Sequence, residues 1–262
     1  MYKVKLTNSH FKAQNDAEIR DITIGDLLKE ISDTHPNAVA MVDVMDDGEC
    51  GKSWNYSDLF KQSDLLAKAL TTRFKVGEKV VICAPNIHEW IFMEYACALS
   101  GLVLVTANPS FQAAELKYVI EQSGAVGLFL INEFRDNPMG DIAKEAMKGN
   151  TLIREVVNLE NQESLYANKN QNTKLPEVKP EDAAQIQYTS GTTGFPKGAV
   201  LSHKSLLNNA RLFCARKNVG PHSVWANFMP LFHTAGCTTG ALGCLQAACK
   251  MLLIKRYNAD NF

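Results

Sequence analysis

The stretch Tyr-Thr-Ser-Gly-Thr-Thr-Gly-Phe-Pro-Lys-Gly, residues 188–198, is the most informative segment of this chain. Its eleven residues include four Ser or Thr hydroxyls, three glycines and one lysine. Small residues of this kind let the backbone approach a large anion, so that N–H groups and hydroxyls bind phosphate oxygens while the lysine adds a positive charge. A bare Gly-x-x-Gly is more typical of a surface turn, but the whole stretch predicts a polyphosphate-binding loop.

The position of Lys197 distinguishes this loop from the commonest phosphate loop. The pattern Gly-x-x-x-x-Gly-Lys-Ser/Thr needs a lysine directly after its second glycine and a hydroxyl residue after the lysine. Here Lys197 follows Pro196 and precedes Gly198. The loop is therefore not typical of P-loop kinases or GTPases. It resembles the phosphate-binding signature of the AMP-forming adenylating enzymes, which include acyl-CoA synthetases, aryl-CoA ligases, luciferases and the adenylation domains of peptide synthetases.

A second motif, Met-Pro-Leu-Phe-His-Thr-Ala-Gly at residues 229–236, lies downstream of the loop. Taken alone, a histidine after an apolar strand is more often a hydrogen-bonded packing residue than a functional one. Its place after the phosphate loop reverses that preference, because the segment resembles the aromatic-His-x-x-Gly motif at the wall of the acyl pocket in the family. The resemblance implies that His233 is catalytic and stabilises developing charge beside the acyl-adenylate. His203 is expected only to begin a helix.

The resemblance also implies the roles of the loop residues and the substrates. Lys197 would assist as a mobile cation, and the remaining loop residues would bind the β- and γ-phosphates: Thr189, Ser190, Gly191, Thr192, Thr193 and Gly194. The implied reaction uses ATP, Mg²⁺ and coenzyme A to convert a small-molecule carboxylic acid to an acyl-adenylate and then to an acyl-CoA. Residues 230–237 (Pro-Leu-Phe-His-Thr-Ala-Gly-Cys), with the Gly- and Ala-rich residues that follow, are most similar to fatty-acyl-CoA synthetases, which favours a fatty acid.

Shorter segments upstream extend the resemblance. Residues 54–59 (Trp-Asn-Tyr-Ser-Asp-Leu) and 75–80 (Lys-Val-Gly-Glu-Lys-Val), with Pro85-Asn86, are similar to early family elements. We expect structural roles for both elements. Pro109 lies where family members commonly have a turn after a strand.

The bulk composition excludes several classes of protein. The 262 residues are 46% hydrophobic, enough for one large or two small domains with a sizeable core. Basic (27) and acidic (28) residues nearly cancel, so neither nucleic acid nor an anionic membrane is indicated as the main partner. The seven cysteines form no Cys-x-x-Cys pair, and we expect most of them to be core residues rather than disulfides or metal ligands.

No secretory signal or membrane segment is evident. The first six residues mix charges with apolar residues, and the apolar stretch 91–107 is interrupted by Glu94 and Ser100 and is too short for a spanning helix. We expect a cytoplasmic protein. The residues leave open whether an apolar substrate also brings it to membrane surfaces.

Strand-like and helix-like segments alternate along the chain and predict an α/β fold. Helices are expected from Thr23 to near Pro36, from about Ser57 to Leu70, and over 88–99, 113–122, 141–147 and 204–218. Thr23 and Asp26 form an approximate capping box for the first helix, and Leu116, Val119 and Ile120 are expected to face inward from the helix over 113–122. Strands are expected over 80–84, 102–106, 126–131, 155–159, 224–229 and 251–254, with another through Ile186 and Tyr188 that leads into the loop. This alternation favours largely parallel sheets with flanking helices.

Two further segments bear on chain organisation. The polar, Asn-rich segment 160–180 is the best linker candidate and divides the chain into parts 1–159 and 181–262. Gly236, Gly240 and Gly243 punctuate a small-residue segment that could be a membrane dimer face, but its threonines and short length favour a closely packed helix in a globular protein.

The chain has about half the length of a typical family member, and the resemblance implies that it is the N-terminal portion of the large AMP-binding domain. The magnesium-binding glutamate, the ribose-binding aspartate and the small C-terminal lid domain with its lysine would all lie beyond Phe262. We therefore expect the parent protein to be a synthetase and residues 1–262 alone, without their C-terminal half, to be inactive.

Two alternatives stay open at this point. Within the family, the chain could come from a luciferase-like enzyme or from a peptide-synthetase adenylation unit. In a different class, it could be a short nucleotide-binding module that pairs with another chain and does no chemistry itself.

Overall fold

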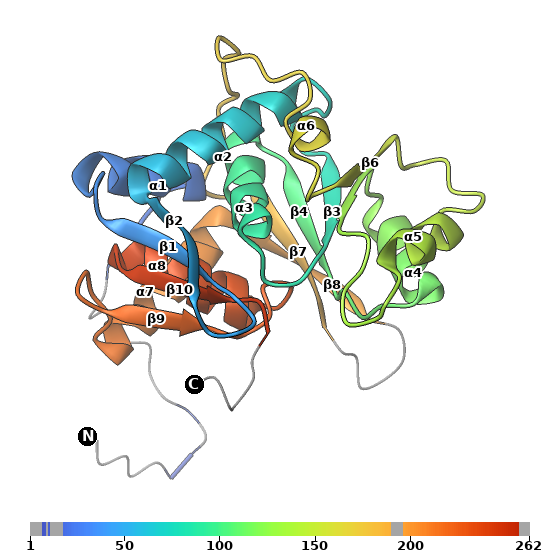
Figure 1. The fold of residues 1–262 in the computed structure, drawn as a ribbon. Helices are drawn as coiled ribbons and strands as arrows, with labels where there is room; N and C mark the ends of the chain where they lie inside the picture. The colour runs from blue at the N-terminus through green and yellow to red at the C-terminus, as the bar shows by residue number, and fades with distance from the viewer. Residues whose placement is uncertain (1–6, 9, 11–17, 190–195, 257–262) are drawn as a thin grey trace.

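The protein folds into two β-sheets with helices packed around them (Figure 1). The structure is a computed structural model and describes residues 7, 8, 10, 18–189 and 196–256. Within these residues most neighbouring strands are parallel, and two pairs are antiparallel. The expected α/β class with largely parallel sheets and flanking helices is confirmed.

The larger sheet has six strands in the order β6-β5-β3-β4-β7-β8. Its strands are β3 (Lys79–Cys83), β4 (Val103–Ala107), β5 (Gly127–Leu130), β6 (Glu155–Asn158), β7 (Ala183–Thr189) and β8 (Lys197–Ser202). All pairs are parallel except the last, in which β8 runs antiparallel to β7. Sequence analysis did not predict β8, because this edge strand is largely exposed and Val200 is 63% exposed.

The smaller sheet has four strands in the order β2-β1-β10-β9. Its strands are β1 (Val39–Val44), β2 (Cys50–Asn55), β9 (Val224–Asn227) and β10 (Lys250–Ile254). The expected strands at β9 and β10 are confirmed, and they pair in parallel with each other and with β1. β1 and β2 were not predicted, and β2 lacks an apolar pattern because most of it is exposed.

The helices predicted from the sequence begin and end close to the expected positions, whereas the short helix over 162–165 lies in the segment 160–180, for which no helix was predicted. They are α1 (Ile24–Thr34), α2 (Tyr56–Thr71), α3 (His88–Ser100), α4 (Ala113–Ser123), α5 (Met139–Ala146), α6 (Gln162–Leu165), α7 (His203–Lys217) and α8 (Gly243–Ala247), with a π-helix, η1 (Ala235–Leu242). The cap predicted for the first helix is present, since the Thr23 hydroxyl accepts a 3.0 Å hydrogen bond from the Asp26 N–H. In Figure 1, α4 and α5 lie together at the end of the molecule farthest from the smaller sheet.

Segment 160–180 packs onto the rest of the chain through helix α6. Arg73 Nη2 donates a 2.8 Å hydrogen bond to the Leu165 carbonyl, and the Leu165 side chain is buried. Parts 1–159 and 181–262 each contribute strands to both sheets. The division of the chain into these two parts stays a prediction.

Buried cysteine and histidine side chains behave as the sequence indicates. All seven cysteines are free, and only Cys50 is exposed. His203 begins α7 as expected and is fully buried. Burial lowers the pKa of His203 to about 4, so its imidazole is neutral at pH 7 and belongs to the packing of α7.

The glycine-punctuated segment forms η1 and α8, as predicted for a closely packed helix. A Cβ at Gly236 would lie 2.2 Å from the Pro230 carbonyl oxygen, and one at Gly240 would lie 2.5 Å from Asn227 Oδ1. These glycines therefore allow the helix to press against the end of β9. Within the ranges that the structure describes, no helix is both long and apolar enough to cross a bilayer.

We predict that Gly236→Ala destabilises the protein, because the clashing atoms at Pro230 belong to the backbone and cannot rotate away. The expected loss in the free energy of unfolding is about 1–3 kcal/mol, measured by denaturant titration. Gly220→Ala is the matched control, since a Cβ there meets nothing within 4 Å. Equal midpoints for the two variants would contradict the close packing of η1.

Candidate active site

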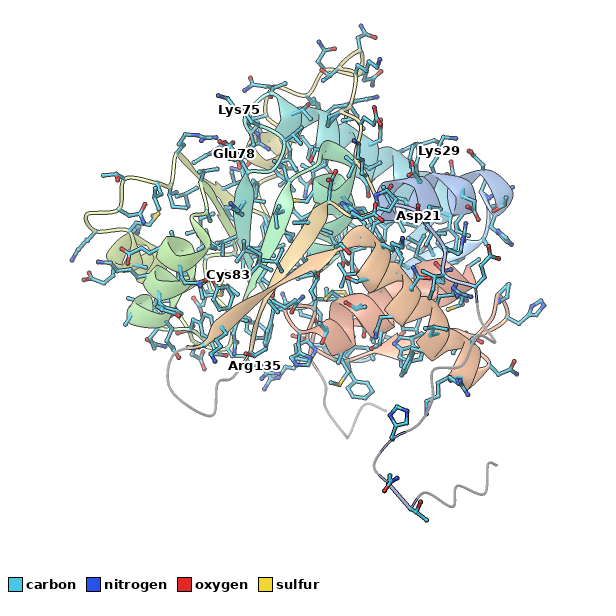
Figure 2. All side chains as sticks on the ribbon, turned by 180° about the vertical axis from the view of Figure 1, so that it is seen from behind. Asp21, Lys29, Lys75, Glu78, Cys83 and Arg135 are labelled. Carbon is cyan, nitrogen blue, oxygen red and sulfur yellow. The ribbon has the colours of Figure 1, made fainter. Side chains whose placement is uncertain are left out.

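The carboxyl ends of the parallel strands β3, β4 and β7 lie at one edge of the larger sheet. Figure 2 shows this direction for β3, with Glu78 just before the strand at one end of the sheet and Cys83 at the other. Since β7 is parallel to β4, Thr189 leaves the sheet at the same edge as Cys83. Ligands of open α/β sheets bind outside this edge, so the predicted phosphate loop has the expected location.

Both stems of the loop are described, and they lie side by side. Thr189 ends β7 and Lys197 begins β8, and the two residues pair in the antiparallel ladder. The Thr189 hydroxyl donates a 3.4 Å hydrogen bond to the Lys197 carbonyl, and both side chains are exposed. The other predicted phosphate ligands lie outside the described residues: Ser190, Gly191, Thr192, Thr193 and Gly194.

Helix α4 holds the base of the loop on both sides. On the first stem, the Tyr188 hydroxyl donates hydrogen bonds to the Val119 carbonyl (3.4 Å) and to Gln122. On the second stem, the Tyr118 hydroxyl donates to the Pro196 carbonyl at 2.9 Å. Burial raises the pKa of Tyr188 to about 12, which keeps it a neutral donor. Neither tyrosine contact was identified from sequence, because helix and loop are far apart in the chain.

His233 lies on the turn between β9 and η1, with its side chain exposed. The turn is closed by backbone hydrogen bonds from the His233 N–H to the Pro230 carbonyl (3.1 Å) and from the Gly236 N–H to the His233 carbonyl (2.9 Å). His233 Nδ1 accepts a 3.1 Å hydrogen bond from the Ala235 N–H. This places the proton of the neutral imidazole on Nε2, which can then donate toward a substrate oxygen.

A buried polar network joins the strand that precedes the loop to the helix that follows His233. Gln185 and Gln187 on β7 are hydrogen-bonded to each other at 3.0 Å, and Gln187 Nε2 also donates to Cys237 Sγ on η1 at 3.2 Å. Gln185 Nε2 donates to Glu94 Oε1 at 2.6 Å. This network was not predicted from the sequence, although two glutamines on one face of a buried strand were the available signal.

Glu94 of this network is a fully buried carboxyl group. Burial raises its pKa to about 8, against the opposing effect of the Gln185 hydrogen bond. The group is therefore mostly protonated and neutral at pH 7. A neutral network is consistent with the surrounding core, because an unpaired charge there would be very unfavourable.

Comparison with known proteins identifies the family. The sequence profile described as AMP-binding enzyme matches residues 28–262. The chain belongs to the AMP-binding enzyme family. The resemblance drawn from the loop and from the His233 motif is thereby confirmed.

Similar proteins include acyl-CoA ligases. The chain is 29% identical over 270 residues to YngI of Bacillus subtilis (strain 168), which covers 92% of this chain and 48% of YngI. It is 28% identical over 232 residues to the acyl-CoA ligase SID4 of Ajellomyces capsulatus (80% and 38%). It is 24% identical over 279 residues to the mouse medium-chain acyl-CoA ligase ACSF2, mitochondrial (94% and 44%). The chain thus spans less than half the length of these relatives.

Several solved structures share the fold. The N-terminal domain of FACL13 from Mycobacterium tuberculosis superposes with a TM-score of 0.79 at 21% identity, over 91% of this chain and 58% of that chain. MbtA from Mycobacterium smegmatis gives a TM-score of 0.79 at 21% identity, over 90% and 44%. At these identities the likeness supports the two-sheet architecture alone.

A second group of charged residues lies at the carboxyl ends of β1 and β10, around a cavity of about 490 Å³. His88 Nδ1 is 2.8 Å from Asp43 Oδ2, and His88 Nε2 is 2.9 Å from Glu89 Oε1. The imidazole also packs against the Trp54 ring at a centroid distance of 4.6 Å. Burial alone would lower the pKa of His88, but the two carboxylates outweigh it and raise the pKa to about 9.

The raised pKa of His88 predicts a pH-dependent stability. Because the pKa in the folded state is above the ordinary value of 6.5, the ion pairs contribute fully below about pH 6.5, and their contribution is lost as the pH rises through about 9. After allowance for solvent screening, we expect the free energy of unfolding to fall by about 1–2 kcal/mol more in the unmodified protein than in His88→Gln over this range.

Denaturant titrations between pH 6 and 10 measure this difference. His222→Gln is the control, since His222 is exposed and its variant should keep the pH slope of the unmodified protein. An unchanged slope in His88→Gln would show that the Asp43 and Glu89 contacts do not stabilise the imidazolium.

Proposed function

We propose that the parent protein is an AMP-forming acid-CoA ligase whose preferred substrates are fatty acids. In the first half-reaction a substrate carboxylate oxygen attacks the α-phosphorus of ATP, which forms the acyl-adenylate and releases pyrophosphate. In the second, the thiol of coenzyme A attacks the acyl carbon and releases AMP. Membership of the AMP-binding family and the acyl-CoA ligases among its relatives support this proposal.

The observation that carries the proposal is the hairpin formed by β7 and β8 at the carboxyl edge of the larger sheet. It presents Thr189 and Lys197 side by side at the two ends of the loop. In this proposal Thr189 and residues 190–194 bind the β- and γ-phosphates, and Lys197 adds a cation. Together they stabilise the negative charge that grows on the departing pyrophosphate.

His233 is the second catalytic residue of the proposal. Its exposed ring has Nδ1 engaged by the Ala235 N–H, so that Nε2 carries the proton of the neutral form. A donor at this position would stabilise charge that develops on the acid during attack. In this proposal the loop of the larger sheet binds the pyrophosphate leaving group, and His233, on the turn after β9 of the smaller sheet, contacts the acid.

Magnesium and coenzyme A enter the proposal through the family resemblance. Among the described residues, no group of three or more His, Cys, Asp or Glu side chains is arranged to hold a metal ion. We further propose a cytoplasmic location and the absence of activity in residues 1–262 alone.

Acid-dependent ATP–pyrophosphate exchange by the full-length protein tests the function. We expect exchange with fatty acids to exceed exchange with acetate and aryl acids. Lys197→Ala should lower the rate by about 100-fold or more, because it removes a positive charge from the transition state. Lys204→Ala is the matched control, since Lys204 forms exposed ion pairs with Asp21 and Glu181 and should leave the rate unchanged.

The other outcomes decide between the alternatives. Exchange that depends on amino acids would favour a peptide-synthetase adenylation unit. ATP binding without exchange for any acid would favour a nucleotide-binding module and contradict the ligase. Pyrophosphate release by residues 1–262 alone, abolished by Lys197→Ala, would contradict the proposed inactivity of this portion.

A further inference from the structure

One buried amide connects the two sheets at the candidate site. Asn86 follows β3 of the larger sheet and is 6% exposed. Its Nδ2 donates hydrogen bonds to the Met229 carbonyl at 3.0 Å and to the Ile254 carbonyl at 3.1 Å, with a longer contact of 3.4 Å to the Asn227 carbonyl. These three carbonyls lie at or just beyond the ends of β9 and β10 in the smaller sheet.

The same side chain also fixes the turn that carries His233. Asn86 Oδ1 accepts a 2.8 Å hydrogen bond from the N–H of Leu231, whose side chain is fully buried. The next residue but one is His233, whose own N–H bonds back to the Pro230 carbonyl. Asn86 therefore binds the backbone on both sides of Pro230, at the start of the turn that presents the imidazole.

The chemistry of the amide matches this environment closely. An asparagine side chain has two N–H donors and one carbonyl acceptor, and here the donors face carbonyls while the acceptor faces an N–H. Aspartate has nearly the same shape, but it has no donor when ionised and would place a negative oxygen against carbonyl oxygens. Asn86→Asp thus removes the hydrogen bonds to β9 and β10 with little change in volume.

We propose that Asn86 is a positioning residue that holds the His233 turn in register with the larger sheet. The inference rests on the proposed function for its catalytic consequence, since it assumes that His233 acts on the acid. Asn86 binds the backbone of the turn, so it would act through His233 and not contact a reacting atom. Its loss should therefore lower the rate of adenylation and leave the binding of ATP by the loop nearly unchanged.

The matched control is another buried asparagine with the same kind of contacts. Asn208 is also 6% exposed, and it exchanges two hydrogen bonds with the backbone of Arg20: Oδ1 accepts at 2.9 Å and Nδ2 donates at 2.8 Å. It lies on α7 and fastens the segment before α1. Asn208→Asp should thus destabilise the fold in a similar way without reaching the His233 turn.

The test combines kinetics with amide exchange in the full-length protein. We expect Asn86→Asp to lower the ATP–pyrophosphate exchange rate at saturating substrates by about 10- to 100-fold, with the KM for ATP unchanged. In a His233→Ala background the same substitution should have almost no further effect, because residues that act as a unit are not additive. Asn208→Asp should leave the rate unchanged in both backgrounds.

Hydrogen–deuterium exchange of a peptide covering residues 227–236 provides a readout that does not depend on activity. We expect its amides to exchange about tenfold faster in Asn86→Asp, and at the unmodified rate in Asn208→Asp. If Asn86→Asp does not fold, the uncharged Asn86→Ser goes through the same measurements. If the unmodified protein is inactive with every acid, the proposed function is overturned. Hydrogen–deuterium exchange of residues 227–236 would still test whether Asn86 holds the His233 turn in position.

Two results would overturn the inference. One is a rate loss of the same size in the His233→Ala background, which would mean that Asn86 acts independently of the imidazole. The other is unchanged exchange of residues 227–236 in a folded Asn86 variant, which would mean that the turn holds its position without the amide.

Discussion

The candidate site depends on hydrogen bonds that cross between two sheets. The predicted phosphate loop follows β7 of the larger sheet, and His233 follows β9 of the smaller one. Apolar packing is non-directional, so by itself it does not fix the register of the two sheets. Hydrogen bonds are directional. The amide of Asn86 joins the end of β3 to the segment after β9, and the contact between Gln187 and Cys237 joins β7 to η1.

These links require polar groups inside an otherwise apolar core. Glu94 and Gln185 are both almost fully buried, and their pairing offsets the unfavourable removal of polar groups from water. Burial also raises the pKa of Glu94 to about 8, and the neutral acid is much easier to bury than the carboxylate. The pair favours one relative position of α3 and β7, because displaced partners would leave both groups unpaired.

Local signals in the sequence predicted the elements that depend on local interactions. The Thr23 cap and the apolar face of α4 are set by neighbours three or four residues away, and both were predicted. The edge strands β2 and β8 are largely exposed, and hydrogen bonds to one partner strand hold each of them in the sheet. Their sequences therefore contain no apolar pattern that predicts a strand. In the site, the loop motif indicated Thr189 and Lys197. The Asn86–Leu231 contact spans 145 positions and could not be read from either segment alone.

The convergence of strand ends explains why the site forms at this junction. β1, β9 and β10 are parallel, so their carboxyl ends share one edge of the smaller sheet. Asn86, at the carboxyl end of β3, contacts that edge, and therefore the carboxyl edges of both sheets meet there. Open α/β sheets bind ligands outside such edges because the loops that leave them are free to carry polar groups. Two edges that meet can bring together groups from distant segments. In the proposed function, the larger sheet contributes the predicted phosphate loop and the smaller sheet the turn that carries His233.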